Sequence, residues 1–217
     1  MNKQKLLFIL YLVIYVTVFL FKIPTLLIEK ITLTNLSIAV YVLLFIIGIT
    51  LYHTTLRKNL SWIVHNKLKS LLILVLGYIG DNLSLIPAFF LINYLGITET
   101  LQNDSDIMIV SQLLSPITII VVLGIIGPIV EELFYRQMLI SSLSTYVPSW
   151  FAILISSFLF ACLHMDARTL NEGLLVIPYF FSGIILGILY KKTDNILFPI
   201  ILHVFVNVTG LIPLLMT

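Results

Sequence analysis

The chain has 217 residues, of which 60% are hydrophobic and only 10% are charged. These values exclude an ordinary soluble domain and indicate a polytopic membrane protein whose main partner is the lipid bilayer. The net charge of +2 argues against nucleic-acid binding, and the single Cys162 excludes both an intramolecular disulfide and a multi-cysteine zinc site.

Charged residues, prolines and glycines divide the chain into about seven hydrophobic segments of near-spanning length. The first segment follows Lys3 and Lys5 and predicts an uncleaved helix, because no small-residue cleavage site follows it. We therefore predict an all-α fold, a transmembrane helical bundle with about seven spans. The predicted spans are 6–21, 35–52, 71–95, 117–143, 149–165, 174–190 and 195–216.

Basic residues predict the orientation of the bundle. With a cytoplasmic N-terminus, the inner side holds Lys3, Lys5, Arg57, Lys58, Lys67, Lys69, Lys191 and Lys192, and the outer side holds only Lys22, Lys30 and Arg168. We therefore predict that the C-terminus lies outside. Residues 1–106 are predicted to form N-terminal transmembrane helices and a basic cytoplasmic loop, and 107–217 a catalytic core. The segment between spans, at 53–70, is either an interfacial helix on anionic lipid or a solvated connection, and its placement favours the helix.

The fourth span carries three ionisable residues in an otherwise apolar sequence. Each such group costs ~2.5 kcal/mol or more in hydrocarbon, so a function beyond folding is expected. Glu132 and Arg136 are four residues apart, so they share a helix face and can form an ion pair. Glu131 points about 100° away and lacks this partner, which makes it a candidate general base.

Three predicted helices bring polar residues to a similar depth. The fourth span carries Glu131, the fifth His164, and the seventh His203 and Asn207. With a rise of about 1.5 Å per residue, all four lie roughly 12 to 22 Å from the inner ends of their helices. This prediction requires the fourth helix to continue through Gly127 and Pro128 as a kinked span. The spacing of four residues also pairs His203 with Asn207, and Phe160 with His164.

Structural explanations exist for several of these residues. An intramembrane Glu–Arg pair can simply hold helices together. Asp81 and Asn82 follow Gly80 and predict a helix irregularity or polar packing rather than a direct role. Gly183 and Gly187 form a Gly-x-x-x-Gly pattern, which favours close packing against a neighbouring helix.

Three short motifs occur in order on successive hydrophobic segments: EELFYR at 131–136, FACLH at 160–164 and HVFVN at 203–207. They resemble the signature motifs of the CAAX protease and bacteriocin-processing family, also called CPBP or Abi. The resemblance covers about 115 to 210. It implies an intramembrane endopeptidase of the bacterial cell membrane that acts on a hydrophobic peptide or membrane-associated protein.

The resemblance also implies a role for each matching residue. Glu131 and His164 would activate a water, and His203 and Asn207 would stabilise the oxyanion. Glu132, Arg136 and Phe160 would support the site. We expect no cofactor, but Glu131, His164 and His203 would also form a zinc site with an open position, so zinc stays an alternative.

Two other functions remain open at this point. The buried Glu and His residues are also compatible with a proton- or metal-coupled transporter, although no inverted repeat is visible. A non-catalytic bacteriocin immunity protein could use the same scaffold to bind a peptide. For the enzyme, we expect the cavity to open to the cytoplasmic side, because the segment 195–199 brings His203 closest to that face. The sequence leaves the oligomeric state undetermined.

Overall fold

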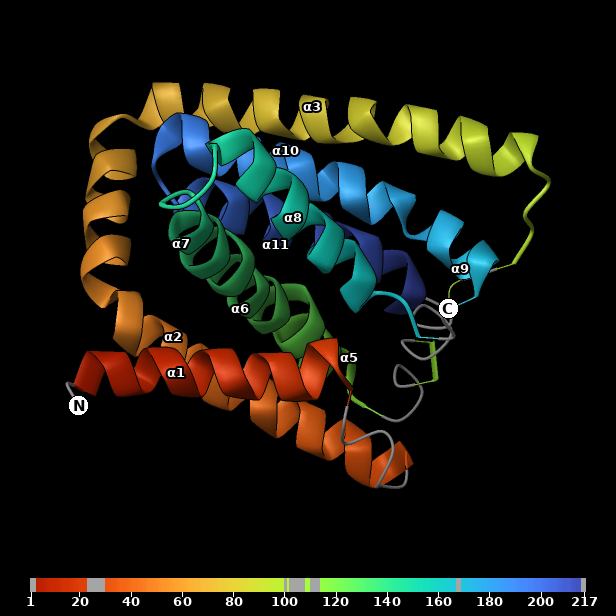
Figure 1. The fold of residues 1–217 in the computed structure, drawn as a ribbon, viewed down its shortest axis with the longest axis horizontal. Helices are drawn as coiled ribbons and strands as arrows, with labels where there is room; N and C mark the ends of the chain where they lie inside the picture. Colours follow the sequence, from red (N-terminus) through yellow and green to blue (C-terminus); the bar gives the residue numbers. More distant parts are fainter. Residues whose placement is uncertain are drawn as a thin grey trace.

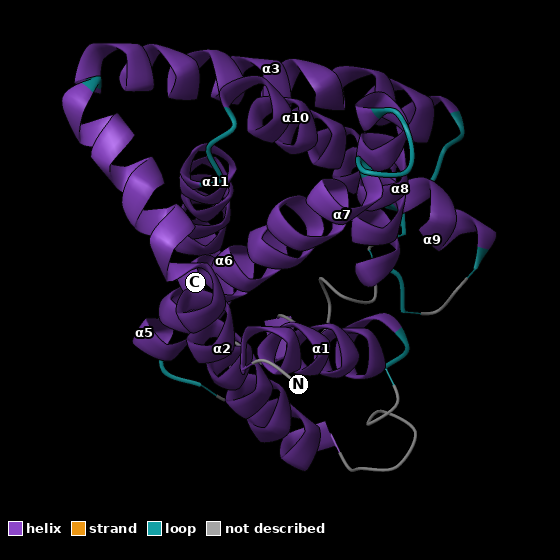
Figure 2. Cartoon of the chain, turned by 60° about the vertical axis from the view of Figure 1, so that its left-hand side comes forward, coloured by secondary structure: helices purple, strands orange, loops and turns teal. Residues whose placement is uncertain are grey.

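A computed structural model describes residues 3–22, 30–99, 101, 108–109, 114–166 and 169–215. Within these ranges all regular structure is helical, which confirms the all-α prediction (Figures 1 and 2). The helices are α1 (Lys3–Tyr15), η1 (Val16–Leu20), α2 (Lys30–His65), α3 (Lys67–Tyr94), α5 (Pro116–Ile119), η3 (Ile120–Ile126), α6 (Gly127–Glu132), η4 (Leu133–Ile140), α7 (Ser141–Leu143), α8 (Ser149–Leu163), α9 (Leu170–Leu175), α10 (Ile177–Thr193) and α11 (Leu197–Leu215).

Four helical stretches in the described part are long and apolar enough to cross a membrane: 35–65, 67–94, 116–143 and 170–193. The other predicted spans are also helical and apolar but shorter, at Gln4–Leu20, Ser149–Leu163 and Leu197–Pro213. All seven predicted segments therefore form helices. They build the helical bundle of a polytopic membrane protein.

The second helix is longer than the sequence predicted. The segment 53–70 is helical, as the favoured interpretation predicted: α2 continues to His65, and α3 begins at Lys67 after a single break at Asn66. The predicted span ended too early, because no proline or glycine lies between Gly48 and Gly77 to end α2 at residue 52. The basic residues of this segment are thus carried on helices.

The helix that carries the first motif runs without interruption from 116 to 143. It passes through Gly127 and Pro128, as was required for Glu131 to lie at the same depth as the polar residues of the other two helices. Proline has no N–H to donate to the preceding turn, and the π-helical turns of η3 end directly before α6. The local change of register therefore accommodates Pro128 without ending the helix.

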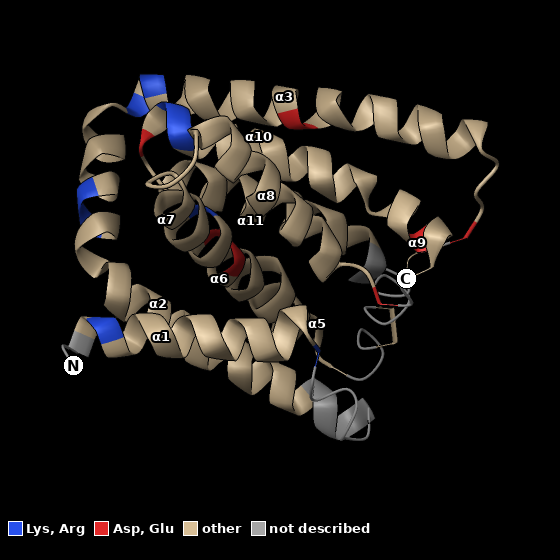
Figure 3. Cartoon of the chain, viewed as in Figure 1, with Lys and Arg blue, Asp and Glu red and all other residues tan. Residues whose placement is uncertain are grey.

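Charge is distributed unevenly along the bundle. In Figure 1, α1 and α3 run along opposite sides, and the second half of α2 crosses between them at one end. Lys and Arg gather at that end, on the start of α1, the second half of α2, the start of α3 and the end of α10 (Figure 3). Acidic residues beside α9 and after α3 lie at the opposite end. The two ends of the bundle thus differ in charge as the sequence predicted.

Aromatic packing holds α1 against the motif-bearing helix, which is the helix 116–143 that carries the EELFYR motif. The rings of Tyr15 and Phe134 stack with centroids 3.9 Å apart, and Tyr135 meets Tyr15 edge to face at 5.7 Å. The hydroxyl of Tyr11 donates a hydrogen bond to the carbonyl of Val130 at 2.8 Å. All of these residues are buried. The backbone beside Glu131 is therefore fixed by the first helix of the chain.

The predicted close packing at Gly183 and Gly187 joins α10 to α8. A Cβ at Gly183 would lie 3.0 Å from the Cβ of Ser157 and 3.1 Å from its backbone Cα, so the backbones themselves would have to separate. We expect Gly183→Ala to lower the free energy of unfolding by about 1–3 kcal/mol, which denaturant unfolding in micelles would measure. Gly210→Ala is the matched control, because a Cβ there meets no atom within 4 Å. Equal stability of the two variants would contradict the packing.

Candidate active site

Glu132 is the centre of a buried polar network that joins three helices. Its Oε1 accepts a hydrogen bond from Nη1 of Arg136 at 2.8 Å, within the same helix, and lies 2.9 Å from Nδ1 of His203 on α11. Arg136 also donates from Nη2 to the carbonyl of Gly183 on α10 at 3.1 Å. Both Glu132 and Arg136 are fully buried. The ion pair predicted from spacing exists, and it also fixes the orientation of His203.

Glu131 and His203 face each other across a short gap. The carboxylate of Glu132 places a proton on Nδ1 of His203, so Nε2 is the nitrogen directed at Glu131, whose Oε2 lies 3.8 Å away. The hydroxyl of Tyr41 on α2 donates to Oε1 of Glu131 at 3.5 Å. Glu131 is 7% exposed and, as predicted, does not share the Arg136 ion pair. A separation of 3.8 Å exceeds a direct hydrogen bond and suits a bridging water.

Phe160 separates the two histidines. Its ring lies 5.0 Å from the His164 ring and 5.6 Å from the His203 ring, both edge to face. The guanidinium of Arg136 lies 4.8 Å from the centre of the same ring. His164 stacks on Tyr179 at 3.9 Å, and its Nδ1 lies 3.0 Å from the Phe160 carbonyl. His164 therefore reaches His203 through an aromatic ring rather than by direct contact.

Asn207 lies one helical turn beyond His203 on α11. Its Nδ2 donates to the carbonyl of Leu123 in η3 at 3.3 Å. Both Asn207 and His203 line the same cavity. The spacing of four residues thus brings two polar groups of α11 to one wall, as the sequence predicted.

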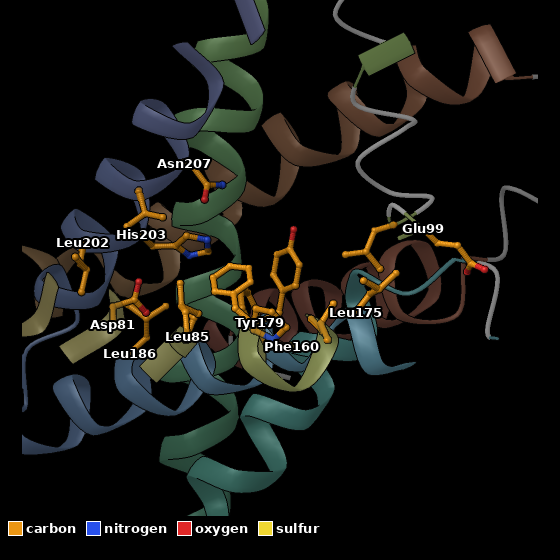
Figure 4. Close-up of a pocket in the computed structure, with 16 residues that line it drawn as sticks. Asp81, Leu85, Glu99, Phe160, Leu175, Tyr179, Leu186, Leu202, His203 and Asn207 are labelled. Atoms are coloured by element: carbon orange, nitrogen blue, oxygen red, sulfur yellow. The ribbon is translucent and has the colours of Figure 1, made fainter. Parts of the chain in front are cut away.

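The cavity has a volume of about 410 Å³ and lies between α3, α8, α10 and α11. Figure 4 shows its labelled residues in a row from Leu202, Asp81 and His203 to Leu175 and Glu99. Glu99 follows α3, at the end of the bundle opposite the basic residues. The cavity therefore extends from His203 towards the end of the bundle opposite the basic residues. The side of the membrane to which it opens stays a prediction.

One residue of this cavity was expected to have a structural role only, and two others were not singled out. Asp81 was expected to mark a helix irregularity or polar packing; α3 is regular there, and the Asp81 carboxylate accepts a hydrogen bond from Ser182 on α10 and also lines the cavity. A charged residue within a membrane helix was the available signal. Tyr179 and Ser182 also line the cavity from α10. No pattern in the sequence distinguishes them from ordinary helix residues.

The alternative zinc set does not converge in this structure. Among the described residues, no group of three His, Cys, Asp or Glu side chains is placed to hold a metal ion. His203 is engaged with both glutamates, whereas His164 is directed at the Phe160 carbonyl and Tyr179. The arrangement of Glu131, His164 and His203 therefore does not fit a three-ligand zinc site.

Comparisons with known proteins agree with the motifs. The sequence model of the family described as type II CAAX prenyl endopeptidase Rce1-like matches residues 113–209. The "Putative membrane peptidase YdiL" of Bacillus subtilis (strain 168) is 33% identical over 112 residues, which are 52% of this chain and 43% of that protein. The "UPF0177 protein YxdF" of Lactococcus lactis subsp. lactis (strain IL1403) is 34% identical over 89 residues, 41% of this chain and 46% of that protein.

The matched regions thus span less than half the length of each of these bacterial relatives. No solved structure matches the chain. All three motifs lie within the matched residues 113–209, and the apolar helices agree with the membrane location in the relative's name. The resemblance inferred from the motifs is confirmed: over residues 113–209, this integral membrane protein is similar to the Rce1-like type II CAAX prenyl endopeptidases.

Proposed function

We propose that this protein is an intramembrane endopeptidase that hydrolyses a peptide bond in a hydrophobic peptide or a membrane-associated protein. The observation that carries the proposal is the pairing of Glu131 with His203, 3.8 Å apart, where His203 also lines the cavity of about 410 Å³. A cavity of this size, mostly apolar with a few converging polar groups, is typical of a ligand site.

In the proposed mechanism, a water held by the carboxylate of Glu131 attacks the substrate carbonyl, and Glu131 takes its proton. His203, protonated on both nitrogens, would donate from Nδ1 to Glu132 and from Nε2 to the developing oxyanion. The amide of Asn207 would supply the second donor. The tetrahedral intermediate would then collapse: its C–N bond breaks as Glu131 passes the proton to the leaving amine, which gives a carboxylic acid and a free amine and restores the Glu131 carboxylate.

The other motif residues would support this arrangement. Glu132 and Arg136 hold the Nδ1 side of His203, and Phe160 packs between the two histidine rings. We propose that His164 assists water activation from its position behind Phe160 and beside Tyr179. We also propose that no metal takes part, because the carboxylates and imidazoles engage one another instead of converging on one point.

The proposed orientation places the N-terminus in the cytoplasm and the C-terminus outside. The support is the collection of Lys and Arg at one end of the bundle, since cytoplasmic segments carry the excess of these residues. In this orientation the cavity extends towards the outer side, where Glu99 lies.

The test is cleavage of hydrophobic peptides, with and without a prenyl group, by the purified protein in detergent. Mass spectrometry of the fragments would compare the wild type with His164→Ala, each with and without a chelator. We expect the wild type to cleave, the variant to lose activity and the chelator to have no effect. Loss with chelator and recovery with zinc would refute the metal-free mechanism. Toxin resistance that persists without any cleavage would favour an immunity protein.

A further inference from the structure

Asp81 is a buried carboxylate on a helix whose neighbouring side chains face outward. It is 3% exposed, whereas Ile79 and Leu83 on the same helix are 47% and 58% exposed. The buried residues of α3 form a single narrow stripe of small side chains in which Asp81 is the only ionisable one: Ser70, Gly77, Asp81 and Ala88. The helix therefore directs this carboxylate into the bundle.

Among the described residues, no Lys, Arg or His forms an ion pair with this carboxylate, although Arg136 and His203 lie close enough to attract it. Its Oδ1 has no hydrogen-bond partner in the described part of the chain. Arg136 is already engaged with Glu132 and the Gly183 carbonyl, and the two nitrogens of His203 are directed at Glu131 and Glu132. Lys69, on the same helix, lies roughly 18 Å away along its axis. Ser182 on α10 donates a hydrogen bond to the carboxylate, but a buried carboxylate that is not paired with a cation is still costly, so a ligand that supplies the positive charge would relieve this cost.

The cavity has the character that such a ligand needs. Its described lining contains two carboxylates, Asp81 and Glu99, and no Lys or Arg. Glu99 already accepts a hydrogen bond from Asn171 at 3.0 Å. The remaining lining is largely Leu, Ile, Val, Phe and Pro. A lysine or arginine side chain matches this environment, because it combines an apolar stem with a charged tip.

The Asp81 carboxylate lies near the place where the peptide bond would be cut. Figure 4 shows Asp81 near His203 at one end of the labelled row, whereas Glu99 lies at the other end. Ser182, a further polar residue of the lining, lies in the same cavity. A substrate whose carbonyl meets His203 would therefore place a neighbouring residue at Asp81, and the rest of its length would extend towards Glu99.

We propose that Asp81 forms a subsite for a lysine or arginine side chain of a hydrophobic peptide substrate, close to the bond that is hydrolysed. This inference rests on the proposed peptidase function for the identity of the ligand as a substrate. It assigns a specificity-determining role to a helix that lies outside the matched residues 113–209.

The test measures binding separately from cleavage. Fluorescently labelled Leu/Ala peptides would carry a single lysine moved one position at a time, and a matched series would carry norleucine, which lacks the charge. Fluorescence anisotropy with Glu131→Gln protein in micelles would give Kd without turnover. We expect one lysine position to bind at least about tenfold more tightly than norleucine, and the added Asp81→Asn substitution to remove this preference. Asp81→Lys should favour glutamate at that position.

The outcomes separate the two proposals. Equal binding of both series, no binding, or a preference that survives Asp81→Asn overturns the subsite. Asp81→Asn should leave the thermal unfolding midpoint unchanged or higher, because it removes a buried charge that has no directly paired cation, while the amide oxygen can still accept from Ser182; a fall of several degrees shows a structural role and also overturns the subsite. Preferential binding without any wild-type cleavage keeps the subsite and rejects the peptidase. Cleavage without a lysine preference keeps the peptidase and rejects the subsite.

Discussion

Glu131→Gln is expected to lower kcat for peptide cleavage by about 10²–10⁴-fold, the range associated with loss of a general base. Glutamine keeps the size of the side chain and can still accept the hydrogen bond from Tyr41, but it cannot take a proton from water. KM should change little, because Glu131 is not among the residues that line the described cavity. Steady-state kinetics on a hydrophobic peptide, at saturating and limiting concentrations, would measure both constants.

The matched control for Glu131→Gln is Asp194→Asn. It makes the same change from carboxylate to amide at an exposed residue that ends α10, near the basic end of the bundle. We expect this variant to retain wild-type kcat. A loss of less than about fivefold in Glu131→Gln would remove Glu131 from the role of base. An equal loss in both variants would instead indicate a general effect on folding.

Helices and their approximate places were predictable because hydrophobic length and charge are local properties of the sequence. The same local evidence predicted the Glu132–Arg136 pair, since residues four apart share a face of any helix. The end of the second span was misplaced at residue 52, because basic residues were taken to end a helix that continues to His65. Charge sets the depth of a segment in a membrane, but proline and glycine interrupt a helix, and none is present there.

Contacts between helices were less predictable. The bond from His203 to Glu132 and the 3.8 Å approach to Glu131 depend on how η3 and η4 rotate the motif-bearing helix around Pro128. Each π-helical turn adds a residue and shifts the faces that follow, which spacing rules for regular helices omit. The position of the cavity depends in the same way on several helices at once. Asp81 therefore appeared as an isolated polar residue until α3, α10 and α11 were placed together.

Arg136→Met is expected to have the largest effect on stability, lowering the free energy of unfolding by about 3–5 kcal/mol. The two side chains of the ion pair are fully buried, so the substitution removes the guanidinium partner of the Glu132 carboxylate and leaves the Gly183 carbonyl without this donor. The arginine's contact with the Phe160 ring is lost as well. Denaturant titration in micelles, followed by circular dichroism, would measure the change. Arg57→Met on the exposed part of α2 is the control and should stay within about 0.5 kcal/mol.

The double variant Glu132→Gln/Arg136→Met distinguishes the ion pair from simple packing. Glutamine removes the unpaired charge while its carbonyl can still accept from His203, so the double variant should be more stable than Arg136→Met alone. Its activity should nevertheless stay low, because a neutral amide holds a protonated His203 less strongly than a carboxylate does. Additive losses of stability would show that Glu132 and Arg136 contribute independently. Recovered stability with reduced catalysis would place the pair where the structure suggests, behind His203, as the support that keeps its Nε2 directed at Glu131.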